Sequence, residues 1–479
     1  MKKPNVLIIM ADQMRADCMG FNNPDIITPN LDSLAKRGTV FNRAYCSSPV
    51  CTPSRGSVLT GRYPQCNGAW NIGVSVNESE ITIADIMANA GYRTGVSGKT
   101  HYRPQCKTDY SFTAEDPAYR DRAREKDGTY YGFQTCHITE DNSIGDYTDW
   151  LKENAPQYLP SLGRPKDAVG DVYTNEIPPE FHKSHWIAQK GIDFINKSSD
   201  DPWMLFVSFV DPHHPFDPSK KFAQMYEGMD TLSRIHKKNG EHDARPEHLR
   251  HQGDKGYWPG GGEEHDKNDE ELAQAIRNYY AMITQMDEEI GRVIKTLEDK
   301  NELDNTIILF TADHGELLGD HGLLYKGPWM YECLVRIPMI MAGPGIPSAL
   351  KTDALFENVD ILPTIAQLTE TAIPYGVQGV SQVPVLEGKC ESVRKSAITI
   401  YDAHDRGIVA TSICTKDLKL VVFLNENYGE LYDLKNDSFE LENLFFNPDY
   451  QPQKAIMMEH LCHHLLANFD PLPERKALW

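Results

Sequence analysis

Three short apolar segments constrain the fold more than any other feature of this 479-residue chain. They cover residues 6–11, 203–210 and 306–312, and the first of them is rich in β-branched residues. Uninterrupted apolar runs of this length are typical of strands that are buried on both faces of a parallel sheet. Amphipathic helical patterns lie at residues 30–37, 82–90 and 272–298. This alternation predicts an α/β fold with a large, doubly wound, mostly parallel sheet flanked by helices.

Polar residues with versatile chemistry follow the end of each apolar segment. These residues are Asp12 and Gln13 after the first segment, Asp211, Pro212, His213 and His214 after the second, and Asp313 and His314 after the third. In open α/β sheets, ligands bind just beyond the carboxyl ends of the strands. The sequence therefore predicts that these side chains share one site.

The pattern changes beyond about residue 375. Residues 397–401, 418–423 and 430–434 are typical of strands that lie close together in sequence, and residues 452–468 are typical of a terminal helix. Closely spaced strands favour an antiparallel sheet. We therefore predict a catalytic domain at residues 1–375 and a smaller C-terminal α+β domain at residues 376–479.

Two polar insertions interrupt the first domain, near residues 103–180 and 236–271. The second contains histidines at positions 236, 242, 248, 251 and 265. One interpretation is a solvated surface, and another is a loop that covers the substrate, because long loops in compact domains often act as lids. A histidine-lined metal tract is a third interpretation of the second insertion.

Charge and apolar content narrow the classes of partner. The 48 basic and 69 acidic residues give a net charge of −21, which opposes nucleic-acid binding. An anionic substrate must therefore be drawn in by a local metal ion or cluster of cations. The apolar runs fall short of the roughly 20 residues of a membrane span. The first run ends in Asp12 and not in a cleavage site, so we expect a cytoplasmic protein if the chain is complete.

The segment at residues 51–62 carries the most specific chemistry. Pro53 fixes the local backbone, and Ser54 can cap a helix that starts there. A cysteine just ahead of a helix N-terminus, here Cys51, lies in a field that favours an anion. Arg55 could hold this side chain or a bound oxyanion. Physical reasoning thus favours a cysteine nucleophile at an anion site, with an inert buried cysteine as the alternative.

The same segment resembles a known family. Its pattern Cys-x-Pro-Ser-Arg-x-x-x-Leu-Thr-Gly-Arg resembles the signature of the type I sulfatases at all eight specified positions. The resemblance implies an alkaline phosphatase-like fold and the hydrolysis of a sulfate monoester. It also implies that a maturation enzyme oxidises Cys51 to formylglycine. The similarity covers about residues 4–445 and excludes the two polar insertions.

Two residue pairs resemble the metal ligands of that family. They are Asp12-Gln13 and Asp313-His314, which the resemblance places around a divalent cation together with the modified Cys51. Calcium suits an oxygen-rich ligand set best, whereas the histidine and the amide leave magnesium or manganese as alternatives.

Three further segments resemble catalytic motifs of the sulfatases. They are Gly98-Lys99-Thr100-His101, Pro212-His213-His214-Pro215 and Lys326-Gly327. In the hydrated formylglycine, one hydroxyl attacks sulfur, and the second then loses a proton and expels sulfate. The resemblance implies that His101 is the base for this elimination and that His213 or Lys326 protonates or stabilises the leaving oxygen. Lys99, Lys326 and Arg55 would offset charge on the sulfuryl oxygens or hold the diol.

Other functions compete with a sulfatase. Phosphonate monoester and phosphodiester hydrolases share the Cys51 signature and the metal site but tend to lack the pair Lys99 and His101. A catalytically silent binding protein would have lost several of these residues, and none is missing. Because no export signal is visible, we expect a small sulfated sugar, an aryl sulfate or a choline-like sulfate as substrate, with neither nucleic acid nor membrane as a partner.

Overall fold

The computed structural model describes residues 3–104, 128–141, 145–162, 165, 171–197, 201–241, 245, 246, 249 and 269–474. The centres of both predicted insertions, and with them the histidines at 242, 248, 251 and 265, lie outside the described residues. Within the described part of the chain, no helix is long and apolar enough to span a membrane.

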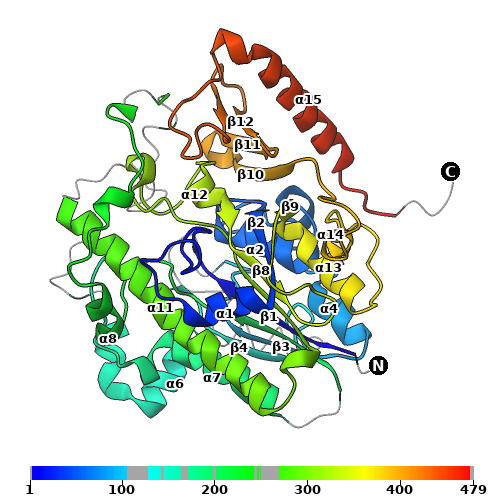
Figure 1. Cartoon of the computed structure of the whole chain (residues 1–479). Coiled ribbons are helices and arrows are strands. Elements are labelled where there is room, and N and C mark those ends of the chain that lie inside the picture. The colour runs from blue at the N-terminus through cyan, green and yellow to red at the C-terminus, as the bar shows by residue number, and fades with distance from the viewer. Residues whose placement is uncertain are drawn as a thin grey trace.

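In the described residues, nine strands form the main sheet (Figure 1). They are β1 (Asn5–Ala11), β2 (Gly38–Tyr45), β3 (Arg93–Gly98), β4 (Thr135–Ile138), β5 (Trp203–Ser208), β6 (Thr306–Ala312), β7 (Arg336–Ile337), β8 (Met339–Ala342) and β9 (Leu350–Glu357). The order is β4-β3-β5-β1-β6-β8-β2-β7, with β9 beside β2. The first five strands of this order run parallel, and β8 is antiparallel to both neighbours. The predicted mostly parallel sheet is confirmed, and the three apolar segments form its adjacent strands β5, β1 and β6.

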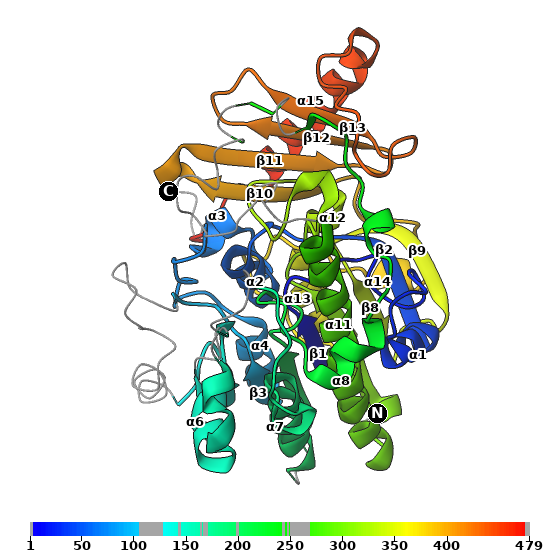
Figure 2. The ribbon, with the colours of Figure 1, turned by 90° about the vertical axis from the view of Figure 1, so that its left-hand side faces the viewer.

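Helices flank the sheet, as Figures 1 and 2 show. On one side, α7 (Lys183–Asn196) packs against α11 (Asp269–Asp299), which also contacts α1 (Pro29–Arg37). A second group contains α2 (Cys51–Thr60), α4 (Ile83–Asn89) and α13 (Ile361–Leu368). The remaining described α-helices are α3 (Pro64–Asn67), α6 (Asp146–Asn154), α8 (Lys220–Ala223), α12 (Glu332–Val335), α14 (Val383–Leu386) and α15 (Gln451–Ala467). The helix α7 lies very close to β3, since a Cβ added to Gly95 would meet the ring of Phe194 at 2.5 Å.

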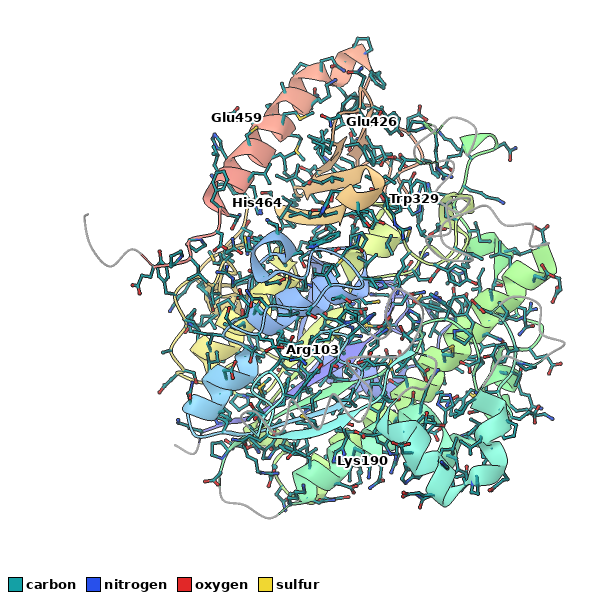
Figure 3. All side chains as sticks on the ribbon, turned by 180° about the vertical axis from the view of Figure 1, so that it is seen from behind. Arg103, Lys190, Trp329, Glu426, Glu459 and His464 are labelled. Carbon is teal, nitrogen blue, oxygen red and sulfur yellow. The ribbon has the colours of Figure 1, made fainter. Side chains whose placement is uncertain are left out.

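The C-terminal region forms a separate antiparallel sheet, which confirms that part of the predicted fold. Its order is β10 (Ala397–Ala403), β11 (Ile408–Cys414), β12 (Leu418–Phe423) and β13 (Gly429–Asp433). The predicted boundary near residue 375 falls between β9 of the main sheet and β10 of this one. Helix α15 covers the small sheet and carries His464 (Figure 3). Nε2 of His464 lies 3.1 Å from the Tyr63 hydroxyl of the main domain.

Candidate active site

The carboxyl ends of four parallel strands bring charged side chains together. Asp12 follows β1, Lys99 follows β3, Asp141 comes shortly after β4, and Asp313 follows β6. The Lys99 ammonium lies 2.7 Å from Asp12 and 2.5 Å from Asp141. Burial alone would raise the pKa of Asp12, but Lys99 and the other nearby cations hold it well below its usual range. The carboxylate of Asp12 is therefore ionised.

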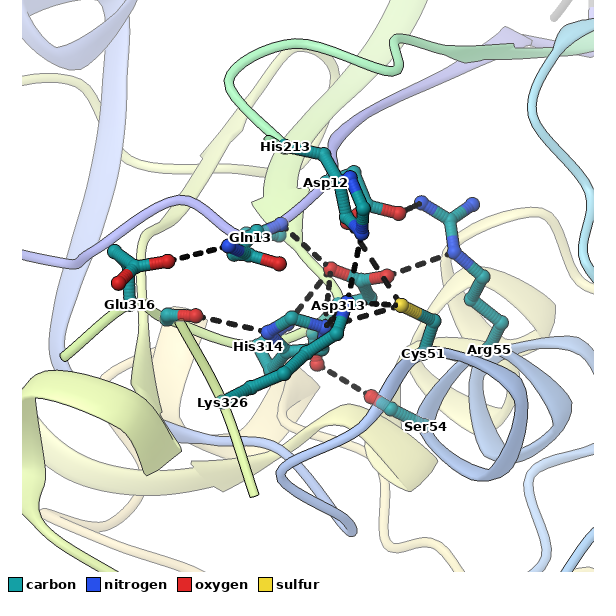
Figure 4. Close-up of polar contacts among 12 residues, drawn as sticks. Asp12, Gln13, Cys51, Ser54, Arg55, His213, Asp313, His314, Glu316 and Lys326 are labelled. Atoms are coloured by element: carbon teal, nitrogen blue, oxygen red, sulfur yellow. Dashed lines mark hydrogen bonds and ion pairs between the residues drawn. The ribbon is translucent and has the colours of Figure 1, made fainter. Parts of the chain in front are cut away.

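Cys51 is the first residue of helix α2 and faces these strand ends. Its sulfur lies 2.8 Å from the Lys326 ammonium and 3.2 Å from Nε2 of His314. Figure 4 shows these side chains around Cys51. Burial and the Asp12 carboxylate raise the pKa of the Cys51 thiol to about 12. Because the thiolate is the reactive form of cysteine, the unmodified side chain is a poor nucleophile here.

Ser54 does not cap the helix, so that prediction was wrong. Helix α2 starts three residues earlier, at Cys51, and Val50 at the cap position provides no side-chain hydrogen bond. The Ser54 hydroxyl instead donates to the backbone oxygen of Asp313 at 2.5 Å and accepts from Asn358 at 2.8 Å. Ser54 thus ties α2 to the end of β6.

Arg55 joins the two aspartates that follow β1 and β6. Its Nε lies 2.8 Å from Asp313, and its Nη2 lies 2.8 Å from Asp12. Nη1 donates to the Ser208 hydroxyl and to the backbone oxygen of Lys99. The planar guanidinium thereby fixes both carboxylates at once. Sequence reasoning expected Arg55 to hold Cys51 or an oxyanion, and the structure gives it these two carboxylates instead.

His314 presents an unprotonated nitrogen to the site. Its Nδ1 lies 2.8 Å from the backbone oxygen of Gly315, so Nδ1 carries the proton and Nε2 is left with a lone pair that can bind a metal ion. Burial lowers the pKa of His314 to about 4, which keeps the ring neutral. One ligand atom each of Asp12, Cys51, Asp313 and His314 lies within 4.8 Å of the others. Four of the five predicted ligands thus form a compact cluster.

Gln13 adds a fifth donor to this cluster. Its backbone has a φ of 63°, and its backbone N–H donates to Asp313 at 2.9 Å. Its amide nitrogen donates to Glu316 and lies 3.2 Å from Nδ1 of His214. The amide oxygen is buried and has no hydrogen-bond partner. An orphaned buried oxygen beside two carboxylates and a neutral imidazole fits a bound divalent cation.

Two adjacent histidines have different surroundings. Nε2 of His213 lies 2.9 Å from the Lys326 ammonium and 3.8 Å from Asp141. The ring of His214 packs against Tyr325, with centroids 4.5 Å apart. The structure therefore places His213, and not His214, beside the lysine that reaches Cys51.

His101 lies on the strand-end loop that also carries Lys99. Its backbone N–H donates to Glu140 at 2.9 Å, and its Nδ1 is buried without a hydrogen-bond partner. Burial and the nearby Lys99 ammonium lower the pKa of His101 to about 3. The imidazole is therefore neutral and has a nitrogen available to accept a proton.

Sequence reasoning missed Asp141 and gave no role to Glu316. Asp141 follows a four-residue strand inside a segment that was interpreted as a polar insertion. The signal in the sequence was weak, because only two apolar residues of β4, Cys136 and Ile138, precede Glu140 and Asp141.

The ion-paired charges at the site balance before a cation is added. Among the described side chains, three carboxylates (Asp12, Asp141 and Asp313) face three cations (Arg55, Lys99 and Lys326), and the buried Glu140 and Glu316 lie beside this group. A divalent ion would add two positive charges to this cluster. The site could therefore attract an anionic ester although the chain carries a charge of −21.

Known proteins resemble this chain along its whole length. The family described as Sulfatase matches residues 4–371, and the family described as N-sulphoglucosamine sulphohydrolase, C-terminal, matches residues 319–466. An arylsulfatase from Clostridium perfringens is 32% identical, with 97% of this chain and 94% of that protein covered. A choline-sulfatase from Rhizobium meliloti is 30% identical, with 93% and 83% covered. The crystal structure of a phosphonate monoester hydrolase of Agrobacterium radiobacter has the same fold, with a TM-score of 0.84 at 24% identity over 100% of this chain and 98% of that chain.

Proposed function

The chain belongs to the Sulfatase family, and we propose on this premise that it hydrolyses a sulfate monoester with a formylglycine made from Cys51. The observation that supports this most strongly is the position of Cys51. It starts helix α2 beside the metal-ligand cluster, and its sulfur is 2.8 Å from Lys326. A protonated thiol in this position has little use as a nucleophile, whereas a hydrated aldehyde there could attack sulfur.

The residues present fit a divalent cation. Asp12, Gln13, Asp313 and His314 would hold it together with the modified side chain at position 51. The donors are mainly oxygen atoms, which favours calcium, with magnesium or manganese as alternatives. A bound ion of this kind would neutralise sulfate oxygens and make a hydroxyl at position 51 easier to deprotonate.

The surrounding side chains supply the proton transfers. One hydroxyl of the hydrated aldehyde loses its proton and attacks sulfur, and the bond between sulfur and the ester oxygen breaks, so that the released proton replaces the one that the leaving oxygen takes up. The pair formed by His213 and Lys326 would give a proton to that leaving oxygen. The neutral His101 would then take the proton of the second hydroxyl, so that sulfate leaves and the aldehyde is restored. Water rehydrates the aldehyde, and the net reaction consumes one water for each ester.

The substrate class follows from the site and the relatives. The similarity to an arylsulfatase and a choline-sulfatase supports a small aryl, choline-like or sugar sulfate. Lys99 and His101 lie together at the end of β3, which favours a sulfate ester over the alternative of a phosphonate monoester or phosphodiester.

The test compares two preparations of the same chain. Protein coexpressed with a formylglycine-generating enzyme should hydrolyse a nitrophenyl sulfate in a metal-dependent manner, and mass spectrometry should show the aldehyde at position 51. Protein made without that enzyme should retain the thiol and lose turnover, as should Cys51→Ala. Equal turnover by the aldehyde and thiol forms would overturn the proposal.

A further inference from the structure

Glu316 contacts both the metal-ligand cluster and the loop that carries Lys326, although the mechanism above gives it no role. Its side chain is fully buried and lies three residues after Asp313. We propose that Glu316 is a positioning residue that orients the Gln13 amide, so that the amide oxygen and not the nitrogen faces the cation. The inference rests on the proposed metal-dependent function.

The orientation of the amide follows from what surrounds it. The Gln13 amide nitrogen donates to Oε2 of Glu316, and Nδ1 of His214 lies 3.2 Å from the same nitrogen. One N–H bond of the amide is thus accepted by the Glu316 carboxylate, and Nδ1 of His214 can accept the other when that nitrogen carries no proton. Turning the amide over would bring its oxygen against an oxygen of the ionised Glu316 carboxylate, so the ionised form of Glu316 favours one orientation. The amide oxygen is left buried without a partner.

The second oxygen of Glu316 fixes the carboxylate itself. Oε1 accepts from the backbone N–H of Leu318 at 2.9 Å and from that of Tyr325. Tyr325 immediately precedes Lys326 and has a φ of 65°. The same carboxylate therefore orients Gln13 and anchors the loop that brings Lys326 to Cys51.

The variant Glu316→Gln separates the two roles of Glu316, which are to orient the Gln13 amide and to anchor the loop that carries Lys326. The introduced amide can still accept from both backbone N–H groups through its oxygen, so the loop keeps its anchor. Its nitrogen then faces the nitrogen of Gln13, and Gln13 must turn over to avoid this contact. That turn would point N–H bonds at the cation and weaken binding.

A second background makes the test specific. With Gln13→Glu, the side chain at position 13 has two equivalent oxygens, so one can face the cation and the other can accept from the amide at position 316. Glu316→Gln should therefore weaken calcium binding when position 13 is Gln, but not when it is Glu. A double-mutant cycle isolates this coupling from the stronger intrinsic binding of a carboxylate.

The experiment measures calcium dissociation constants by calorimetry on metal-stripped proteins, with thermal unfolding as a check on folding. We expect Glu316→Gln to weaken binding about 10- to 100-fold in the wild-type background and less than about 3-fold in the Gln13→Glu background. The matched control Glu430→Gln alters another buried carboxylate, in the small sheet, and should leave calcium affinity unchanged. Unchanged binding in the wild-type background, or an equal loss in both backgrounds, would overturn the inference. A wild-type protein that binds no divalent cation would instead overturn the proposed function.

Discussion

The ammonium of Lys326 lies 2.8 Å from the sulfur of Cys51, although 275 residues separate the two in the chain. The same nitrogen lies 2.9 Å from Nε2 of His213 and 3.3 Å from Nε2 of His314. The lysine loop thus reaches the N-terminus of α2 at the point where the proposed chemistry takes place.

Replacing this lysine should impair turnover. We expect Lys326→Met to lower kcat by about 10²- to 10³-fold, because a positioned cation next to the reacting group is lost. Steady-state kinetics on a nitrophenyl sulfate would measure this, and thermal unfolding would show whether the variant is folded. A folded variant with wild-type kcat would mean that the contact with Cys51 has no catalytic role.

Arg55→Lys should disturb the metal site through its carboxylates. One ammonium cannot reproduce the two parallel contacts that Arg55 makes with Asp12 and Asp313, each at 2.8 Å. We expect calcium affinity to fall about 10-fold or more, as measured by calorimetry. The control is Arg103→Lys, because the Glu78 partner of Arg103 is 53% exposed and the exchange should alter affinity little. Equal effects of the two exchanges would contradict this role of Arg55.

His213→Ala should have an effect that depends on the leaving group. If His213 and Lys326 together protonate the leaving oxygen, loss of His213 should lower kcat/KM for an alkyl sulfate about 10²- to 10⁴-fold, because the alkoxide needs a proton to leave. The loss should be much smaller on a nitrophenyl sulfate, whose leaving group is stable as an anion. A plot of log(kcat/KM) against leaving-group pKa would steepen in the variant. The same factor on both esters would argue for a structural role.

Glu430 should make stability depend on pH. Burial and the Glu440 carboxylate raise the pKa of Glu430 to about 7. Between about pH 4 and pH 7, the folded state therefore keeps a proton on Glu430 that the unfolded state has released. The free energy of unfolding falls as the pH rises through this window and levels off above about pH 7. From pH 5 to pH 8, the free energy of unfolding should fall by about 3 kcal/mol more in the wild type than in Glu430→Gln, whose amide does not titrate. Urea unfolding at the two pH values measures the difference, and parallel losses would contradict the prediction.

The centre of the fold was predictable because its strands are buried on both faces. β1, β5 and β6 are mainly apolar because both faces of each strand are buried. Their sequences therefore lack the polar residues that would make another secondary structure equally plausible. β3 was not identified as a strand, because its sequence Arg-Thr-Gly-Val-Ser-Gly has little apolar content. Gly95 in this strand makes room for the ring of Phe194, a requirement that appears only when α7 is packed on the sheet.

The site residues that belong to a sequence motif could be predicted. Those that reach the site only through strand pairing or contacts between distant loops could not. The segment around Cys51 and the strand-end pairs identified the residues that now lie together. Asp141 could not be linked to Lys99, because only the pairing of β3 with β4 brings them to 2.5 Å. The contact of Glu316 with Gln13 spans 303 residues and depends on two loops that meet in space.

The most direct test of the central claim is a comparison of three esters that share one nitrophenol leaving group. They are a sulfate monoester, a phosphate diester and a phosphonate monoester, assayed with calcium-loaded protein that carries formylglycine at position 51. We predict the highest kcat/KM for the sulfate, because Lys99 and His101 accompany Cys51 in this site. A higher kcat/KM for either phosphorus ester would contradict the proposed substrate class while leaving the fold unchanged.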